Sequence, residues 1–156
     1  AYTAQPGAMT SAERGLLNTI WGPGMSAEPA DRAIIPELAP EPGDTVFTKW
    51  RYSAFHASDL GEWLAKNDRD QLIVCGVYAH IGILATVIDS FSRDIEPFLA
   101  ADAIADFSPE YHMLALDYAA RNCAVVLPSE HTRAAIDDSR ITTAASTGPA
   151  VKGGDP

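Results

Sequence analysis

From residue 45 onward, short apolar runs alternate with amphipathic stretches. The apolar runs cover residues 45–48, 71–76, 97–101 and 123–127. None of them shows strict apolar/polar alternation, which is typical of strands covered on both faces. The intervening stretches predict helices over residues 58–67, 78–93 and 108–122. This β–α alternation predicts an α/β fold.

The N-terminal third is less regular. The segment from Ala1 to Gln5 is typical of the last half of a buried strand. Residues 10–13 match a capping box ahead of Leu16 and Ile20, so a helix is predicted over residues 11–20, with Arg14 in its first turns. Residues 22–43 carry five prolines and three glycines, which favours a loop with at most a short helix near residues 31–38.

The helix predicted over residues 108–122 has the clearest start. It opens Ser108-Pro109-Glu110, which places a capping hydroxyl, a first-turn proline and a first-turn acid in succession. After about residue 138 the chain is small, polar and rich in glycine and proline. We therefore expect one domain over residues 1–137 and a flexible C-terminal tail over residues 138–156.

Charge narrows the possible partners. The net charge is −10 and the pI is near 4.6, with the 11 Lys and Arg residues scattered, so a nucleic-acid partner is not expected. No stretch approaches the roughly 18 apolar residues that span a bilayer, and the first residues lack a signal-peptide pattern. We expect a cytoplasmic protein with no membrane partner.

Three segments together carry a specific resemblance. They are Tyr2-Thr3-Ala4-Gln5-Pro6-Gly7 with Arg14-Gly15-Leu16-Leu17 and Trp21-Gly22-Pro23-Gly24; Thr48-Lys49-Trp50-Arg51-Tyr52-Ser53-Ala54-Phe55; and Cys75-Gly76-Val77-Tyr78-Ala79-His80-Ile81-Gly82. A fourth segment, residues 101–108, extends the likeness, which runs from Ala1 to about Leu127. The chain resembles the isochorismatase family, and within it the enzymes of siderophore and phenazine pathways.

The resemblance implies a three-layer αβα fold around a six-stranded, mostly parallel sheet. It also implies hydrolysis of the enol-pyruvyl ether of isochorismate or 2-amino-2-deoxyisochorismate, which releases pyruvate. The phenazine-type substrate is modestly preferred, because no carrier domain is appended and Met9-Thr10 follows the Gly7 turn. The family commonly forms dimers, so a homodimer is expected.

Such a substrate carries two carboxylates, and the resemblance assigns residues to them. Gln5, Arg14 and Lys49 supply amide or cationic donors, and the guanidinium of Arg14 suits bidentate carboxylate binding. Lys49 ends a predicted strand, where a buried ammonium is costly without an anionic partner. Trp21 completes this part of the predicted substrate site.

Tyr78 and Gly82 lie in the third motif. The resemblance places a non-proline cis peptide before Tyr78, which aims backbone groups at the substrate. Relatives that hydrolyse amides carry a nucleophilic cysteine at the position of Gly82. A glycine there favours acid chemistry, in which a carboxylic acid protonates the vinylic carbon and water adds to the resulting oxocarbenium ion.

In the family, that acid is an aspartate at the end of a first strand, so the resemblance places it upstream of Ala1. We therefore expect a fragment that lacks this strand, its helix and the acid, with a central sheet position unfilled. Asp102 and Asp106 are weak substitutes, because capping and loop-holding hydrogen bonds are their ordinary roles.

No metal, cofactor or nucleotide is expected. His56, His80 and His112 lack the spacing of metal ligands, and the sequence contains no glycine-rich phosphate loop. The proposed reaction needs only water as its second reactant.

Two other interpretations stay open. A cysteine amidohydrolase would need a nucleophile near Gly82; Cys75 lies before the turn, and both Cys75 and Cys123 are expected to be buried structural thiols. A non-catalytic binding or assembly module would keep Arg14 and Lys49 without turnover.

Overall fold

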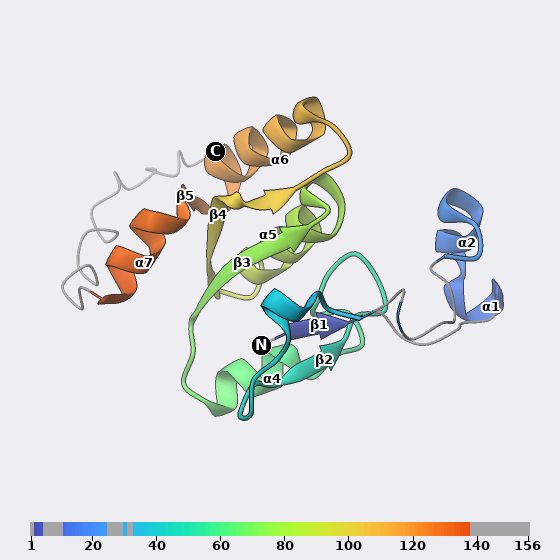
Figure 1. Cartoon of the computed structure of the whole chain (residues 1–156), viewed down its shortest axis with the longest axis horizontal. Helices are drawn as coiled ribbons and strands as arrows, with labels where there is room; N and C mark the ends of the chain where they lie inside the picture. Colours follow the sequence, from blue (N-terminus) through green and yellow to red (C-terminus); the bar gives the residue numbers. More distant parts are fainter. Residues whose placement is uncertain (1, 5–10, 25–29, 31–32, 138–156) are drawn as a thin grey trace, which may run out of the picture.

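The computed structural model describes residues 2–4, 11–24, 30 and 33–137 of the 156-residue chain (Figure 1). The strands are β1 Tyr2–Ala4, β2 Val46–Thr48, β3 Gln71–Val77, β4 Glu96–Ala105 and β5 Val125–Leu127. The helices are α1 Ser11–Arg14, α2 Leu16–Trp21, α4 Leu60–Lys66, α5 Leu84–Phe91, α6 Pro109–Asn122 and α7 Ser129–Asp137, with a 3-10 helix at Pro36–Leu38 and a π-helix at Ala79–Ile83. The predicted tail lies outside the described residues.

All the strand pairs among the described residues are parallel, in agreement with the mostly parallel sheet that the resemblance implies. They form two ladders, β1–β2 and β3–β4–β5. Within the described part of the chain, β3 therefore pairs on one edge only.

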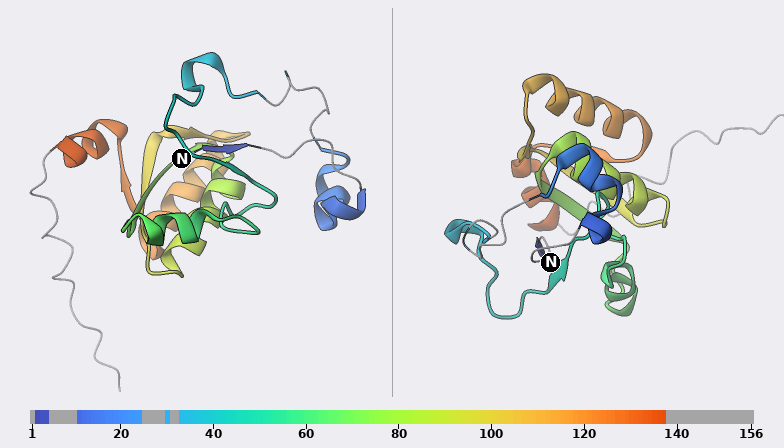
Figure 2. Two further views of the ribbon diagram at one scale, coloured as in Figure 1. Left: turned by 90° about the horizontal axis from the view of Figure 1, so that it is seen from below. Right: turned by 90° about the vertical axis from the view of Figure 1, so that its right-hand side faces the viewer.

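Helices lie on both sides of the strands. α4, α5 and α6 are on one side, below the strands in the left view of Figure 2, and the 3-10 helix Pro36–Leu38 is on the other. The core between β3, β4, α5 and α6 includes Val87, Leu99, Ala115 and Ala119, none of which is accessible to solvent. Burying a side chain such as Leu99 contributes about 1.5–3 kcal/mol. This packing fixes the ends of β3 and β4, where the predicted site lies.

β4 is longer than predicted and changes its register against β3. Val74 pairs with Leu99, but Gly76 pairs with Ile104, so β4 advances five residues while β3 advances two. Gly76 has φ of 114°, a conformation that side chains with a Cβ disfavour. The extra residues of β4 bend the strand before it reaches Asp106.

Three sequence-based boundaries are wrong for local reasons. The helix predicted over residues 11–20 breaks at Gly15, whose φ of 54° leaves the helical region, and continues as α2 to Trp21. The helix predicted over residues 78–93 begins as a π-helix at Ala79, because β3 continues to Val77. The strand predicted from residue 123 begins at Val125, since Cys123 still ends α6.

Two further differences concern the surface. Helix α7 was not predicted; it begins at Ser129, whose backbone N–H and hydroxyl both donate to Asp102 on β4. Cys75, on β3, is exposed rather than buried, whereas Cys123 is buried as expected. Both thiols are free.

Candidate active site at the carboxyl ends of the strands

Lys49 follows directly after β2 and reaches the π-helix. A Cβ placed on Gly82 would lie only 2.9 Å from Lys49 Nζ and 3.5 Å from the carbonyl oxygen of Tyr52. A contact of 2.9 Å is shorter than a Cβ tolerates, so any side chain at position 82 would displace the ammonium group. The absence of a side chain at Gly82 therefore provides the space that Lys49 occupies.

Lys49 is half-buried, and its burial lowers its pKa below the ordinary value for lysine. Across the ranges 2–4, 11–24, 30 and 33–137, no carboxylate forms an ion pair with it. A partly desolvated cation without an anionic partner costs free energy in the folded protein. This position is suited to an anionic ligand.

Tyr78 lies between β3 and the π-helix, and the peptide bond that joins it to Val77 is cis, as the resemblance implies. Its carbonyl oxygen accepts hydrogen bonds from the backbone N–H groups of Ile81 and Ile83. Its ring stacks on Phe107, with the ring centroids 4.1 Å apart and the planes 23° apart. Phe107 comes from the turn between β4 and α6, so two strand ends contribute to this stack.

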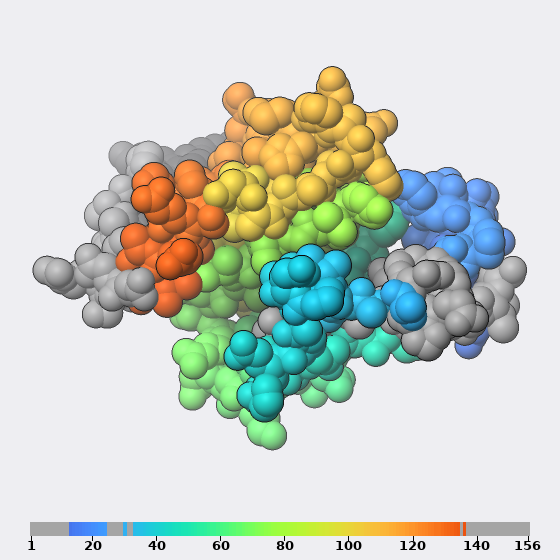
Figure 3. Space-filling model, viewed as in Figure 1, coloured from blue at the N-terminus to red at the C-terminus, as the bar shows by residue number. Residues whose placement is uncertain are grey.

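Trp21, at the end of α2, joins the same region. Its ring centroid lies 6.1 Å from that of Phe107, and its Nε1–H donates to the hydroxyl of Tyr52 at 2.8 Å. We call Trp21, Tyr52, Tyr78 and Phe107 the aromatic rim. Figure 3 shows the segment from Glu13 to Gly24, which includes α2, in blue at one end of the molecule beside the gold atoms of the β4–α6 turn.

The aromatic rim and the Lys49–Gly82 contact form a closed series. Lys49 contacts Gly82, which lies in the π-helix that follows Tyr78. The ring of Tyr78 stacks on Phe107, and Phe107 lies beside Trp21. Trp21 donates to Tyr52, which is three residues after Lys49. Trp21, Tyr78 and Phe107 are 43, 44 and 55% exposed. Exposed aromatic side chains gathered beside a cation are typical of a ligand-binding surface.

The segment that carries Lys49 is tied to α5. The hydroxyl of Thr86, which is buried, donates to the carbonyl oxygen of Gly82 at 2.7 Å and accepts from the backbone N–H of Ala54 at 3.0 Å. The hydroxyl of Ser53 donates to the carboxylate of Asp89. These bonds fix the backbone on both sides of the Lys49–Gly82 contact.

Arg14 is not part of this series of contacts. Its Nε donates to the carbonyl oxygen of Gly22 at 2.9 Å, and its guanidinium lies against Gly24. Arg14 is thus held beside the end of the helix that carries Trp21. The nearby Arg51 donates to the carbonyl oxygen of Glu13, which ties α1 to the Lys49 segment.

Two of the expected site groups lie outside the described residues. Gln5 is one of them, so its part in substrate binding stays a prediction. Ala1 is also outside the described residues, and the aspartate expected upstream of Ala1 is absent from the printed sequence. The structure therefore leaves the position of the general acid untested.

Asp102 and Asp106 hold loops, as predicted. Asp102 accepts from Ser129, and Asp106 accepts from the backbone N–H groups of His80 and Phe107. Desolvation raises the pKa of Asp106, but its hydrogen bonds outweigh that effect, so its pKa lies below the ordinary value; hydrogen bonds from Ser129 likewise lower the pKa of Asp102. Carboxylates held in the ionised form are poor proton donors at neutral pH.

Tyr52 and Phe107 were missed as site residues. Both lie inside motifs that carry the resemblance, but no spacing rule brings residues 21, 52, 78 and 107 together. Only the parallel order of the strands, which gathers their carboxyl ends at one edge, could have suggested Phe107.

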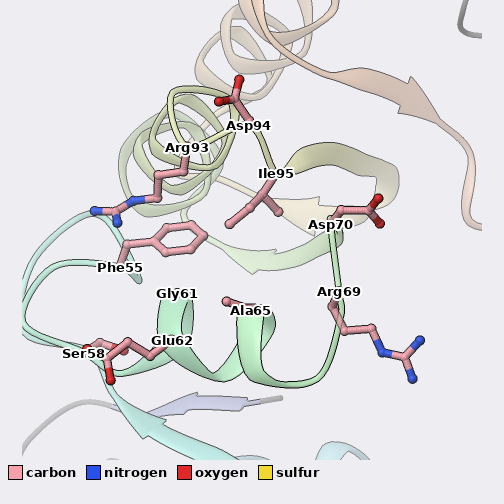
Figure 4. A pocket seen from close by; sticks show the side chains of 10 residues that line it. All are labelled: Phe55, Ser58, Gly61, Glu62, Ala65, Arg69, Asp70, Arg93, Asp94 and Ile95. Atoms are coloured by element: carbon pink, nitrogen blue, oxygen red, sulfur yellow. The ribbon is translucent and has the colours of Figure 1, made fainter.

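The structure also contains a cavity of about 550 Å³ at the opposite end of β3 (Figure 4). It lies between α4 and the segment before β4, and its lining includes Phe55, Ala65, Asp70, Arg93 and Ile95. Asp70 precedes β3, whereas the aromatic rim lies beyond its other end. Because ligands of open parallel sheets bind beyond the carboxyl ends of the strands, the Lys49 end is the candidate active site and the cavity is not.

The chain belongs to the isochorismatase family. The family model "Isochorismatase domain" matches residues 3–131. The chain is 58% identical over 130 residues to the phenazine biosynthesis protein PhzD of Pseudomonas fluorescens, covering 83% of this chain and 63% of that protein. It is 48% identical over 140 residues to enterobactin synthase component B of Escherichia coli K12, covering 89% of this chain and 49% of that one.

A solved structure shows the same fold. The cysteine hydrolase from Pseudomonas syringae matches with a TM-score of 0.80 at 22% identity, over 87% of this chain and 70% of that one. The chain spans between half and two thirds of the curated relatives named above. None of the helices in the described ranges has the length and apolar character that a membrane crossing requires.

Proposed function

We propose that the chain is part of a hydrolase that cleaves the enol-pyruvyl ether of isochorismate or of 2-amino-2-deoxyisochorismate. The carrying observation is the contact between Lys49 Nζ and Gly82, which puts a cation where amide-hydrolysing relatives carry a nucleophile. The names of the relatives place them in phenazine and enterobactin biosynthesis, and both pathways agree with this substrate class.

The proposed reaction begins with protonation of the terminal vinylic carbon by a carboxylic acid. The resulting oxocarbenium ion takes up water, and the hemiketal collapses to pyruvate and the ring alcohol, while the proton lost from water returns to the carboxylate. The resemblance places this acid, an aspartate, upstream of Ala1. The ionised state of Asp102 and Asp106 supports taking the acid from outside the described residues.

In this proposal Lys49 binds a substrate carboxylate and stabilises the charge that develops beside it. A cation that is already desolvated when the substrate arrives loses little further hydration on binding, so its interaction with an anion is strong. Arg14 and Gln5 bind the second carboxylate, and Trp21 and Tyr78 pack against the ring.

Pyruvate release from the two candidate substrates tests the function. It is measured on the 156-residue chain and on the longest polypeptide read in the same frame, in water enriched in oxygen-18. We expect pyruvate, a ring alcohol without oxygen-18, and faster turnover of the amino substrate, which corresponds to the phenazine pathway. Oxygen-18 in the ring hydroxyl would place water attack on the ring and contradict the mechanism.

Cysteine labelling separates this function from amide hydrolysis. Cys75 is exposed and free, so a thiol reagent will reach it. We expect labelled protein to keep its rate of pyruvate release, because β3 carries Cys75 before the turn to Gly82. Loss of activity together with release of ammonia from an amide would favour the cysteine hydrolase instead.

We also propose that the protein acts as a cytoplasmic homodimer. The family commonly forms dimers, and α6 exposes Tyr111, Met113, Leu114 and Tyr118, which are 46–59% accessible. Exposed apolar groups on one helix are typical of an interface. Light scattering at micromolar concentration should give twice the mass of one chain.

A further inference from the structure

The turn from β4 to α6 contains one fully enclosed carboxylate. The Asp106 side chain has no solvent-accessible surface. Its Oδ2 accepts the backbone N–H of His80 at 2.6 Å and lies 2.7 Å from His80 Nδ1, and its Oδ1 accepts the backbone N–H of Phe107 at 2.7 Å. Short bonds to a carboxylate are among the stronger hydrogen bonds in proteins.

The Asp106 carboxylate connects the two backbone segments that carry the stacked rings of Tyr78 and Phe107. His80 follows Tyr78 by two residues, and Phe107 follows Asp106 directly, so one side chain fixes the backbone beneath both stacked rings. The imidazole of His80 also stacks on Tyr111 of α6, with the ring centroids 4.3 Å apart. The separation of Tyr78 from Phe107 is therefore set by Asp106 rather than by the ring contact alone.

We propose that Phe107 is a substrate-contacting residue that selects six-membered ring acids with a flat conjugated diene face, and that Asp106 is the positioning residue that holds Phe107 against Tyr78. The inference rests on the proposed function and deepens it. Phe107 is 55% exposed although it already stacks on Tyr78 and lies beside Trp21, so it retains surface for a second ring. Aromatic faces favour flat unsaturated partners in an offset or tilted arrangement.

The geometry explains why a carboxylate stands at position 106. Three donors converge on it, and only an ionised carboxylate accepts from all of them. An asparagine keeps the volume, but its amide nitrogen would face at least one N–H group. The change should therefore loosen the stack without opening a cavity.

The test compares Asp106→Asn, Phe107→Leu and the double variant in the longest polypeptide that contains the chain. Asp102→Asn is the matched control, because Asp102, which lies on β4, likewise accepts two hydrogen bonds from a helix start, but at α7. Three quantities are measured: KM, kcat, and the dissociation constant of the ring product, a dihydroxy-cyclohexadiene carboxylate. The thermal midpoint of each variant reports folding.

We expect Asp106→Asn and Phe107→Leu each to raise KM and the dissociation constant about tenfold, with kcat within about threefold of the native value. If Asp106 acts through Phe107, the double variant stays within about threefold of Phe107→Leu alone. Phe107→Tyr, which keeps the ring, should bind the product about as well as the native protein, and Asp102→Asn should keep the native KM.

A rise of about a hundredfold in the double variant would show independent effects and overturn the positioning role. An equal rise in Asp102→Asn would overturn it too, because the loss of any carboxylate that accepts hydrogen bonds from a helix start would then have the same effect. If Asp106→Asn does not fold, His80→Ala takes its place, because it removes the imidazole and keeps the bond from Phe107 to Asp106. We expect His80→Ala to raise KM about threefold. An unchanged KM would overturn the proposal.

Product binding keeps the two proposals apart. If the native protein releases no pyruvate yet its affinity for the ring product depends on Phe107 and Asp106 as described, the proposed reaction fails and this inference stands. If pyruvate is released but the two positions act additively, only this inference fails.

Discussion

At position 82 the chain presents no side chain, and Lys49 occupies the space that a side chain would need. The two residues are 33 positions apart, and their contact depends on the ordered backbone around Thr86. The motif that contains Gly82 predicted that position 82 carries no nucleophile. No sequence pattern showed that Lys49 would lie against Gly82. At the scale of single residues, the role of Lys49 follows from its side chain filling the space beside Gly82.

Gly82→Ala tests whether Lys49 needs the space that the missing side chain at position 82 leaves. The added methyl group would lie 2.9 Å from Lys49 Nζ, so we expect the ammonium to move and kcat/KM for pyruvate release to fall about a hundredfold. Gly61→Ala in α4 is the control, because its Cβ would meet Arg93 and Phe55 only at 3.7 Å. It should keep full activity. Full activity in Gly82→Ala would mean that the Lys49 position is unimportant.

Lys49→Met should stabilise the protein. Burial lowers the pKa of Lys49, so the unfolded chain binds the proton more readily than the folded one. The destabilisation is complete below the folded pKa and disappears as the pH rises toward 10.5. We therefore expect the thermal midpoint at pH 7 to rise by roughly 2–4 °C, read by circular dichroism. A lower midpoint would show that Lys49 has a stabilising partner.

At the scale of elements, the sequence predicted α6 and the place of each strand because these signals are local, but it did not predict the length of β4 or the start of β5. The start of α6 follows its Ser-Pro-Glu opening, and the hydroxyl of Ser108 accepts the backbone N–H of Tyr111 at 3.3 Å. The break at Gly15 and the π-helix before α5 were missed because the positive φ of Gly15 and the continuation of β3 to Val77 leave no mark on the apolar pattern of these two segments. Helix α7 was missed because its cap is completed by Asp102, 27 residues earlier.

Ser108→Ala tests the cap of α6. Removing the hydroxyl leaves the N–H of Tyr111 without its acceptor, and such caps contribute about 1 kcal/mol. We expect the free energy of unfolding in urea to fall by about that amount. Ser92→Ala, which removes an exposed hydroxyl bonded within α5, should change it by less than half as much. Equal effects would show that the cap adds nothing specific.

At the scale of the whole molecule, parallel strands gather chemistry from distant segments at one edge. Trp21, Lys49, Tyr78, Gly82 and Phe107 come from four separate parts of the chain. The resemblance identified four of these five residues before the fold was known, while Phe107 required the strand order. The roles of Gln5 and of an acid upstream of Ala1 stay predictions, and the shared role of Arg14 and Lys49 stays a proposal.

Low pH should destabilise the fold, because it protonates the hydrogen-bonded carboxylates of Asp89 and Asp106. The pKa values of Asp89 and Asp106 are lowered because hydrogen bonds outweigh the desolvation that opposes them. Their stabilisation is present above the ordinary aspartate value of 3.8 and is lost as the pH falls through the lower folded values. Urea unfolding at about pH 5 and about pH 3 should show the loss, and Asp106→Asn should show less of it. An equal loss in that variant would exclude Asp106 as a source.

The central claim is that the ammonium of Lys49, seated against Gly82, holds the anionic enol ether during its hydrolysis. The direct measurement is kcat/KM for pyruvate release by Lys49→Met beside the native protein, both in the longest polypeptide read in frame. The account predicts a fall of about a hundredfold or more in a variant that remains folded. A folded Lys49→Met protein that retains kcat/KM within about threefold of the native value would contradict it.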